Sequence, residues 1–512
     1  GFHQVVEDVQ ISVWTMPVVG LRFRSGRIDA RRSSNHAKRS VSKDQTNLKS
    51  ENIVHSIYSD SFTSRVLVAV VLLATFLSPL SAKPRENQSQ LTLDRIYNST
   101  DFESDSLTIQ WLAASRGYTT LESDSNGQKI VSHDAVTGET EILVSANEIT
   151  PGLESPAIRI ESYSFSKSLG KVLIYTNSKR VWRRRTRGDY WVLDRASGEL
   201  RKLGERLPAS SLMFAKFSPT GDQVAYVYNR DIYVEDLRRP HVLRLTTAES
   251  PFVINGTSDW VYEEELGLRD GFRWSPDGHS IAFWQIDTEG VRTFLLVNNT
   301  VGLYPAIHEF AYPKVGQRNP ICRVGVVNVA NQQIRWMKVD GDPRNHYIAR
   351  MQWLDNRQLA VQQLNRLQNT NRLLLADTRD GSVAECFVDQ DPAWVEPCDE
   401  LVWIDNREAF TWTSERDGWR HVYLSNRDGS SRCATRGEFD VIRLLHVDES
   451  GHWLYFIASP DDATCRYLFR QSFDGSGLQR LTPSEQTGWH TYSVSPNGKW
   501  SIHTWSSTES VP

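Results

Sequence analysis

The sequence predicts an all-β chain that folds as a β-propeller, because two patterns recur along it at a nearly constant spacing. Short β-rich runs dominate from Lys83 to the end, and no stretch keeps a 3.6-residue apolar period over three turns. A Ser-Pro-x-Gly turn recurs ahead of apolar strands, and a strand followed by a polar hairpin recurs later in each unit. A unit of about fifty residues with four antiparallel strands is a propeller blade.

The recurring turn is complete at residues 218–221, 275–278 and 495–498. Proline presets φ at the second turn position, and the glycine supplies the positive φ that follows. An alternating apolar run comes next in each case, which predicts strands at 223–228, 280–284 and 500–505.

The spacing of the copies sets the number of blades. Complete and degenerate copies begin near residues 166, 218, 275, 354, 404, 448 and 495, so successive starts lie 44 to 57 residues apart, except for one interval of 79 residues. The wide interval predicts an insertion between residues 275 and 354. The 430 residues from Lys83 onward correspond to seven or eight blades. A two-sheet sandwich is the alternative, but it requires no repeat at a fixed spacing.

Composition excludes several classes of protein. The chain has 58 basic and 62 acidic residues, and neutralising a nucleic-acid backbone requires a basic excess, so we expect no nucleic-acid partner. The 53 aromatic residues exclude a disordered chain. Five cysteines without a CxxC pair are too few for a disulfide scaffold or a thiolate zinc site. We expect neither a metal nor a cofactor.

The first 82 residues differ from the rest. Residues 1–64 are predicted to be a basic, disordered leader, and residues 65–82 contain an apolar run at 66–77 followed by Ser-Pro-Leu-Ser-Ala. The run is shorter than a membrane span needs and has the length of a signal-peptide core. A start site placed too far upstream explains the long leader; a signal anchor at 66–80 with a basic tail is the alternative, and only then would the chain contact a membrane. In both cases residues 83–512 are expected to be exported.

One acidic string stands out because the sequence lacks the usual catalytic motifs, including GxSxG, HExxH and the phosphate-binding loops. Residues 259–266 read Asp-Trp-Val-Tyr-Glu-Glu-Glu-Leu, which predicts the first turn of a short helix. Acidic residues are favourable at a helix N-terminus for purely structural reasons. The functional alternative is that neighbouring carboxylates facing a cavity bind a cation, because an arriving ammonium relieves their repulsion.

A basic string occurs at residues 181–190, where Trp182 is followed by Arg183, Arg184 and Arg185. A basic hairpin tip commonly protects a sheet edge from pairing. Arginine is also the side chain best shaped to hold a carbonyl or carboxylate with two donors.

These strings resemble a known family. Residues 259–265 and 272–278, together with segments 91–96, 312–316 and 414–421, are similar to the amino-terminal propeller of dipeptidyl peptidase IV and its relatives in the prolyl oligopeptidase clan. The similarity runs from about residue 91 to the end. It implies an eight-bladed propeller in which a short helix carries the glutamate cluster.

The resemblance also implies a function and its residues. Family members remove dipeptides from free peptide amino termini and prefer Pro or Ala at the second position. Glu264 and Glu265 would bind the substrate ammonium, and Arg183 would orient a peptide carbonyl, with Arg184 and Arg185 as competitors for that role. A homodimer is a further expectation from the family.

The sequence departs from the family where catalysis is concerned. Family members carry the Ser, Asp and His nucleophile system in an α/β-hydrolase domain after the propeller, and residues 506–512 resemble the end of the propeller. We therefore expect a truncated product without catalytic residues, whose partners are peptides with a free amino terminus and a separately encoded hydrolase domain. The alternative is a free-standing propeller that binds peptides or proteins without catalysis.

Overall fold

The computed structural model describes residues 10–13, 91–99, 101, 109–113, 117–152 and 155–508, with residues 10–13 described by their backbone alone. The chain divides into two compact units. One contains residues 1–25 and 107–512, and the other contains residues 26–106.

In the smaller unit the structure describes one helix, α2 (Leu93–Asn98). Its N-cap is Thr92, whose hydroxyl accepts a hydrogen bond of 3.1 Å from the backbone N–H of Arg95. The segment 91–96, which carries part of the family resemblance, therefore leads into a helix of this unit. The apolar run at 66–77 lies outside the described residues.

The larger unit contains every described strand, and all strands of its sheets pair antiparallel. The first four-stranded sheet contains β2 (Ile109–Trp111), β3 (Gly117–Asp124), β4 (Gly127–Asp134) and β5 (Thr140–Val144). An eight-stranded sheet follows, with β6 (Ser162–Phe165), β7 (Lys171–Val181), β8 (Arg184–Asp194), β9 (Leu200–Lys202), β10 (Leu212–Phe217), β11 (Gln223–Tyr228), β12 (Asp231–Asp236) and β13 (His241–Arg244).

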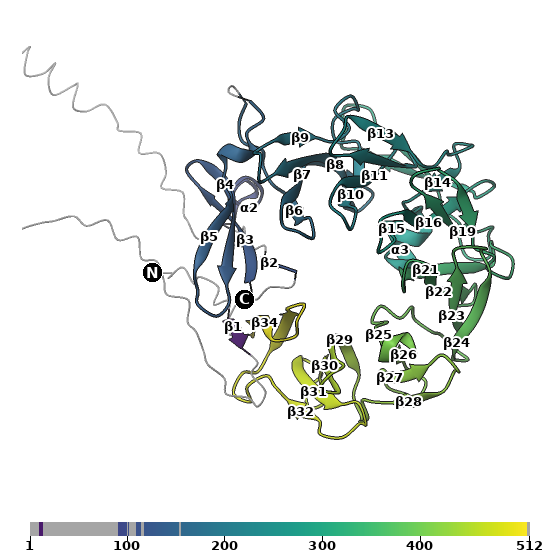
Figure 1. The fold of residues 1–512 in the computed structure, drawn as a ribbon. Coiled ribbons are helices and arrows are strands. Elements are labelled where there is room, and N and C mark those ends of the chain that lie inside the picture. The colour runs from purple at the N-terminus through teal and green to yellow at the C-terminus, as the bar shows by residue number, and fades with distance from the viewer. Residues whose placement is uncertain are drawn as a thin grey trace, which may run out of the picture. The chain divides into compact units, whose positions relative to one another are not determined.

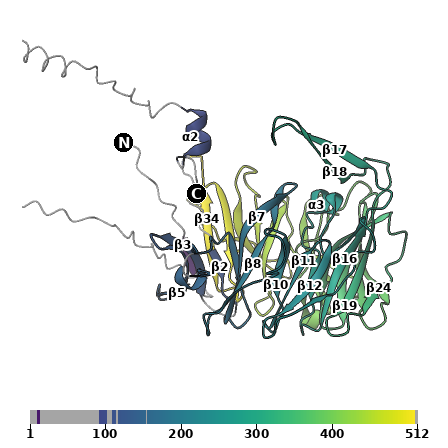
Figure 2. The ribbon, with the colours of Figure 1, turned by 90° about the horizontal axis from the view of Figure 1, so that it is seen from above.

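The next sheets contain the expected insertion. A five-stranded sheet consists of β14 (Val253–Asn255), β15 (Phe272–Trp274), β16 (Ser280–Asp287), β19 (Ile321–Asn328) and β20 (Ile334–Trp336). Between β16 and β19 the chain forms a separate hairpin of β17 (Thr293–Asn298) and β18 (Ala306–Ala311). The wide interval in the sequence repeat is therefore explained by this hairpin, which projects beyond the sheets in Figure 2.

Three further sheets have four strands each. They contain β21 (His346–Trp353), β22 (Gln358–Asn365), β23 (Thr370–Asp377) and β24 (Val383–Gln390); β25 (Trp403–Ile404), β26 (Ala409–Ser414), β27 (His421–Asn426) and β28 (Ser431–Cys433); and β29 (Val441–Asp448), β30 (Trp453–Ala458), β31 (Tyr467–Ser472) and β32 (Gln479–Arg480). The last sheet joins β33 (Trp489–Val494) and β34 (Trp500–Ser506) to β1 (Gln10–Val13), a strand within the expected leader. The described helices of this unit are η1 (Asn147–Ile149), α3 (Trp260–Leu266) and η2 (Asp405–Arg407).

Successive sheets of the larger unit follow one another around a common centre (Figure 1). The first and last of them are in contact, because Trp111 Nε1 donates a hydrogen bond of 3.0 Å to the carbonyl of Ser493. The all-β class is confirmed, and so is the short helix expected at the glutamate string.

The Ser-Pro-x-Gly turn has the same geometry in all three complete copies. The backbone N–H of the serine donates a hydrogen bond of 2.8 Å to the carbonyl of the first residue of the following strand. The serine hydroxyl accepts a hydrogen bond from the backbone N–H of that same residue. The glycines at 221, 278 and 498 have φ between 68° and 75°, a region that favours glycine. The turn therefore closes onto β11, β16 and β34, and these predicted strands are confirmed.

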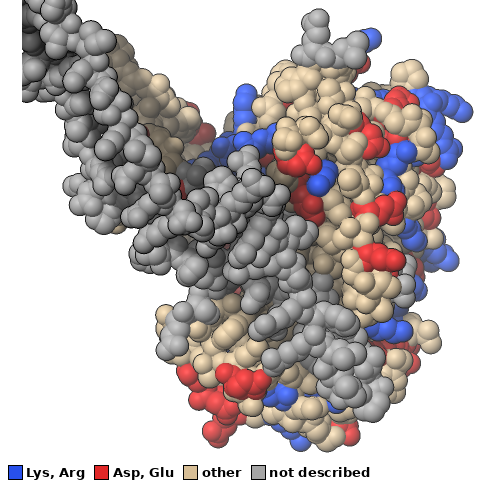
Figure 3. All heavy atoms as spheres, turned by 90° about the vertical axis from the view of Figure 1, so that its left-hand side faces the viewer, with Lys and Arg blue, Asp and Glu red and all other residues tan. Residues whose placement is uncertain are grey.

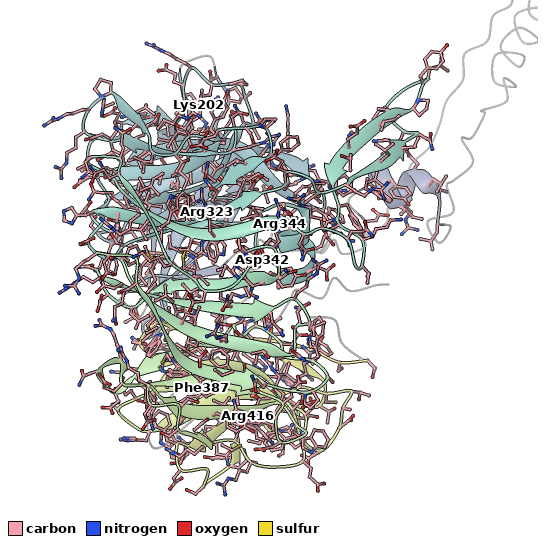
Figure 4. The ribbon with its side chains drawn as sticks, turned by 90° about the vertical axis from the view of Figure 1, so that its right-hand side faces the viewer. Lys202, Arg323, Asp342, Arg344, Phe387 and Arg416 are labelled. Carbon is pink, nitrogen blue, oxygen red and sulfur yellow. The ribbon has the colours of Figure 1, made fainter. Side chains whose placement is uncertain are left out.

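Buried tryptophans fasten neighbouring sheets to each other. Trp284 on β16 donates through Nε1 to the carbonyl of Ile348 on β21 at 2.8 Å. Trp412 on β26 donates to the buried carboxylate of Asp389 on β24 at 2.9 Å. Arg416 also reaches Asp389, and its guanidinium lies 5.3 Å from the ring of Phe387 (Figure 4). The apolar core is thus divided among the interfaces between sheets.

The surface shows no single charge sign on the described part of the face in Figure 3, where basic and acidic side chains are intermixed. In the described residues, no helix has the length and apolar character needed to cross a membrane. All five cysteines are free thiols, and only Cys433 is not fully buried.

A histidine pair lies within the last sheet. His490 on β33 and His503 on β34 are buried, with His490 Nδ1 2.8 Å from His503 Nε2. Burial lowers the pKa of each imidazole to about 4. Both rings are therefore uncharged at neutral pH, and one donates its N–H to the other.

We expect this pair to make the folded chain sensitive to acid. An unfolded histidine has a pKa near 6.5, so between about pH 6.5 and pH 4 the unfolded chain binds protons that the folded chain excludes. The free energy of unfolding should fall as the pH decreases through this window, by on the order of 3 kcal/mol for one fully shifted histidine. Urea unfolding at a series of pH values measures the slope.

The variant His503→Phe should unfold more easily at neutral pH, because His490 loses its partner, but its stability should depend less steeply on pH in the same window. His241→Gln on the exposed strand β13 is the matched control. An unchanged slope in His503→Phe would contradict the assignment.

Candidate functional site

The glutamate string forms α3, whose two ends are defined by caps. Asp259 is the N-cap, and its Oδ1 accepts from the backbone N–H of Tyr262 at 3.1 Å. Burial raises the pKa of this carboxyl to about 6, and its Oδ2 has no hydrogen-bond partner among the residues that the structure describes. Gly267 ends the helix in the left-handed region with φ 64°, and Leu268 N–H donates to the carbonyl of Tyr262 at 2.9 Å.

Contacts with β21 fix the orientation of α3. The hydroxyl of Tyr262, a side chain buried to 1% exposure, accepts a hydrogen bond of 3.2 Å from Ile348 N–H. The carbonyl of Leu266, in the last turn, accepts one of 2.8 Å from Arg350 Nη1, and Arg350 forms an ion pair with Asp399. Figure 1 shows α3 on the inner side of the sheet that contains β16 and β19.

The three consecutive glutamates have different surroundings because successive helical residues point in different directions. The side chain of Glu263 is 4% exposed and lies 3.2 Å from Arg269 Nε. Burial raises the pKa of Glu263, and the arginine opposes that shift. Glu264 is half-buried, whereas Glu265 is exposed, and no ion pair is seen for Glu265 among the described residues. The structure thus distinguishes a buried glutamate, Glu263, from the partly buried Glu264 and the exposed Glu265.

Arg183 lies in the tight turn between β7 and β8, directly after Trp182, which has a positive φ of 49°. Its Nε lies 2.8 Å from Glu264 Oε1, and its side chain is 71% exposed against 17% for Glu264. Arg185 turns away and donates to the carbonyl of Ser178 at 2.9 Å. Two residues 81 positions apart in the sequence, both singled out from it, are therefore in direct contact.

An aromatic cluster holds these elements together. It joins the β7–β8 turn, α3 and the β17–β18 hairpin, with ring centroids 4.8 to 6.4 Å apart in the pairs that link the three elements, and consists of Trp182, Trp260, Phe294, Phe310 and Tyr312. Aromatic pairs at such separations favour tilted or edge-to-face packing. The cluster keeps the turn that carries Arg183 next to the helix that carries Glu264.

A cavity of about 490 Å³ adjoins the aromatic cluster. Its walls include Trp182, Trp260 and Phe310 together with Glu263, but neither Glu264 nor Glu265. Of the three glutamates of α3, only Glu263 therefore lines this cavity.

Sequence reasoning missed the residues that support the site. Arg350 is 84 positions away from Leu266, and Ile348 is 86 away from Tyr262, so no local pattern connects them. Arg269 follows Glu263 by six residues, a spacing that does not bring side chains together within a helix. It becomes a partner only because Gly267 reverses the chain.

Comparisons with known proteins agree with the resemblance. The family model described as "Dipeptidyl peptidase IV (DPP IV) N-terminal region" matches residues 166–512. Dipeptidyl peptidase 4 of Trichophyton tonsurans is 28% identical over 405 residues, which cover 75% of this chain and 51% of the relative. Dipeptidyl peptidase 4 of Trichophyton rubrum is 27% identical over 412 residues, covering 78% of this chain and 52% of the relative.

A solved structure shows the same fold. The crystal structure of Porphyromonas gingivalis dipeptidyl peptidase 4 matches with a TM-score of 0.72 and 26% identity, over 81% of this chain and 58% of that chain. The chain spans about half the length of the curated relatives it matches.

The end of α3 gives a direct test of its cap. A Cβ at Gly267 would meet no atom within 4 Å, so Gly267→Ala adds only the strain of a left-handed conformation. We expect it to reduce the free energy of unfolding by about 1 kcal/mol, and Gly267→Asn by less. Urea unfolding measures both values. Gly152→Ala, which also meets no atom and has an ordinary φ, is the control, and equal losses at the two positions would exclude the cap.

Proposed function

Since the chain belongs to the family of the dipeptidyl peptidase IV N-terminal region, we propose that it is the peptide-recognising propeller of an exported serine-type dipeptidyl peptidase. Within that proposal the propeller has eight blades. The eight-stranded sheet supplies two of them, β6–β9 and β10–β13, which are linked where Leu212 pairs with Gly188. The remaining blades correspond to the other sheets, apart from the β17–β18 hairpin.

The contact between Arg183 and Glu264, with Glu265 exposed beside it, carries the proposal. A free peptide amino terminus presents an ammonium group, and the carbonyl oxygen of the same residue follows it. Two neighbouring carboxylates suit the ammonium, and the guanidinium suits the carbonyl. The ion pair with Glu264 occupies the Nε–H of Arg183, and within the described part of the chain its other four N–H donors have no ion-pair partner.

This arrangement selects the end of a peptide rather than its interior. An internal peptide segment has no ammonium to offset the charge of Glu265, so placing it at the site would leave that carboxylate partly desolvated and unpaired. We propose that the glutamates in this way count two residues from the amino terminus, and that the whole protein releases X-Pro or X-Ala dipeptides. The nucleophile for that reaction would come from an α/β-hydrolase domain with a Ser, His and Asp system.

Binding to this chain tests the proposal without catalysis. A short X-Pro peptide with a free amino terminus should bind at least about tenfold more tightly than its N-acetylated form, because acetylation removes the ammonium. Glu265→Gln should reduce the affinity for the free peptide and abolish most of that difference. Isothermal titration calorimetry measures each affinity.

Glu263→Gln is the matched control, since this neighbouring glutamate pairs with Arg269 instead of facing the ligand. It should retain the preference for the free amino terminus, with circular dichroism used to verify folding. Equal affinities of the unmodified chain for the free and acetylated peptides would refute the recognition role.

The role of Arg183 can be tested separately, by comparing a ligand that has a carbonyl group with one that has none. In Arg183→Ala, Glu264 loses its ion pair, so a simple alkylammonium without a carbonyl should bind more tightly than to the unmodified chain. The X-Pro peptide should bind more weakly, because its carbonyl loses a donor. The ratio of the affinity for the X-Pro peptide to the affinity for the alkylammonium, measured by the same titration, reports the carbonyl contact alone. If both affinities changed in the same direction and by the same factor, Arg183 would not bind the carbonyl.

A further inference from the structure

The sequence contains four Asn-x-Ser/Thr motifs, at residues 87–89, 98–100, 255–257 and 298–300. This motif is the acceptor for N-linked oligosaccharides in exported proteins, provided that the asparagine is accessible. The two motifs within the sheets of the larger unit differ sharply in accessibility, which allows the structure to distinguish them.

Asn255 on β14 is inaccessible. Its side chain is 0% exposed, Nδ2 donates to the buried Asp231 Oδ1 at 2.9 Å, and Oδ1 accepts from Gln285 Nε2 at 2.8 Å. An oligosaccharide on Nδ2 would replace one of its two hydrogens and has no space at a side chain that is 0% exposed within the sheet. A chain modified at this position could not adopt this fold.

Asn298 is half-buried rather than buried. It is the last residue of β17, on the hairpin that projects beyond the sheets (Figure 2). The connection that follows is highly exposed, with Leu303 at 92% and Tyr304 at 82%. Among the described residues, the connection at this tip is therefore accessible from solvent.

The local geometry also suits the chemistry. Asn298 Oδ1 accepts hydrogen bonds from the backbone N–H of Thr300 at 2.9 Å and from its hydroxyl at 2.8 Å. These bonds engage the carbonyl oxygen of the amide and not its nitrogen. Nδ2 has only a long contact of 3.4 Å with His308 Nε2, so its hydrogens remain largely available.

The hairpin surface gives such a modification a physical role. Its exposed side chains include Leu295, Leu296, Val297 and Ile307, an unusual concentration of apolar groups for a solvated hairpin. Strand alternation places Asn298 on the same face as Leu296 and Phe294. A hydrated oligosaccharide attached there would cover Leu296, whereas Leu295, Val297 and Ile307 lie on the opposite face of the hairpin.

We propose that Asn298 is an N-glycosylation site and that Asn255 is not, despite its matching motif. The donor is a polyisoprenyl-pyrophosphate-linked oligosaccharide in the lumen of the secretory pathway. Asn298 Nδ2 forms a bond to C1 of the first sugar, the bond from C1 to the pyrophosphate oxygen breaks, and the lipid pyrophosphate leaves with that electron pair. One amide proton passes to a base on the transferase, and nothing is oxidised or reduced.

The test uses the full chain behind a cleavable signal peptide, translated in the presence of microsomes. Chains protected from added protease have entered the lumen and are collected, treated with an N-glycosidase that converts a modified Asn to Asp, and analysed by peptide mass spectrometry. The peptide containing Asn298 should show the conversion in most molecules, and the peptide containing Asn255 should show none in the soluble, folded fraction. Separate peptides report Asn87 and Asn98, so these do not confound the result.

Two variants of Thr300 test whether the conversion at Asn298 depends on the Asn-x-Thr motif at residues 298–300. Thr300→Ala should abolish the conversion at Asn298, whereas Thr300→Ser, which keeps a hydroxyl, should retain it. Unmodified Asn298 in the protected chains would overturn the proposal. So would a folded fraction modified at Asn255, because accessibility would then not decide between the two motifs.

Discussion

The site depends on the anchoring of a helix that is too short to be stable by itself. Seven residues form few intrahelical hydrogen bonds, and isolated helices of that length are marginal in water. The helix α3 persists because its caps satisfy both ends and because Tyr262 and the carbonyl of Leu266 are held by β21. The directions of the three glutamates follow from this anchoring, since each additional residue rotates the side chain about the helix axis.

The sheets provide the rigid frame for that anchoring. Each closes with a short turn and packs its apolar face on its neighbour, and tryptophan N–H groups such as those of Trp284 and Trp412 donate across the interfaces. A buried donor without a partner would be costly, so these bonds favour one relative position of adjacent sheets. The packing of the sheets therefore fixes the position of β21, and the hydrogen bonds from β21 fix the position of α3.

Two of the three glutamates of α3 form ion pairs with arginines of the chain. Glu263 is paired with Arg269 and Glu264 with Arg183, whereas the exposed Glu265 has no ion pair within the described part of the chain. The β17–β18 hairpin takes part indirectly, through aromatic contacts that hold the turn bearing Arg183 against Trp260.

The sequence by itself determined the all-β class, the turns at 218–221, 275–278 and 495–498, the insertion after β16 and the helix at the glutamate string, because each follows from residues adjacent in the chain. It also singled out Arg183, Glu264 and Glu265 through their resemblance to a family. Only the tertiary structure decided that Arg183, rather than Arg184 or Arg185, contacts Glu264, that Glu263 is a buried structural residue, and that Arg350 holds the end of the helix. These features depend on contacts between residues up to 84 positions apart in the sequence. Residues so far apart form no local or periodic pattern, so the amino-acid sequence alone does not reveal that they are in contact.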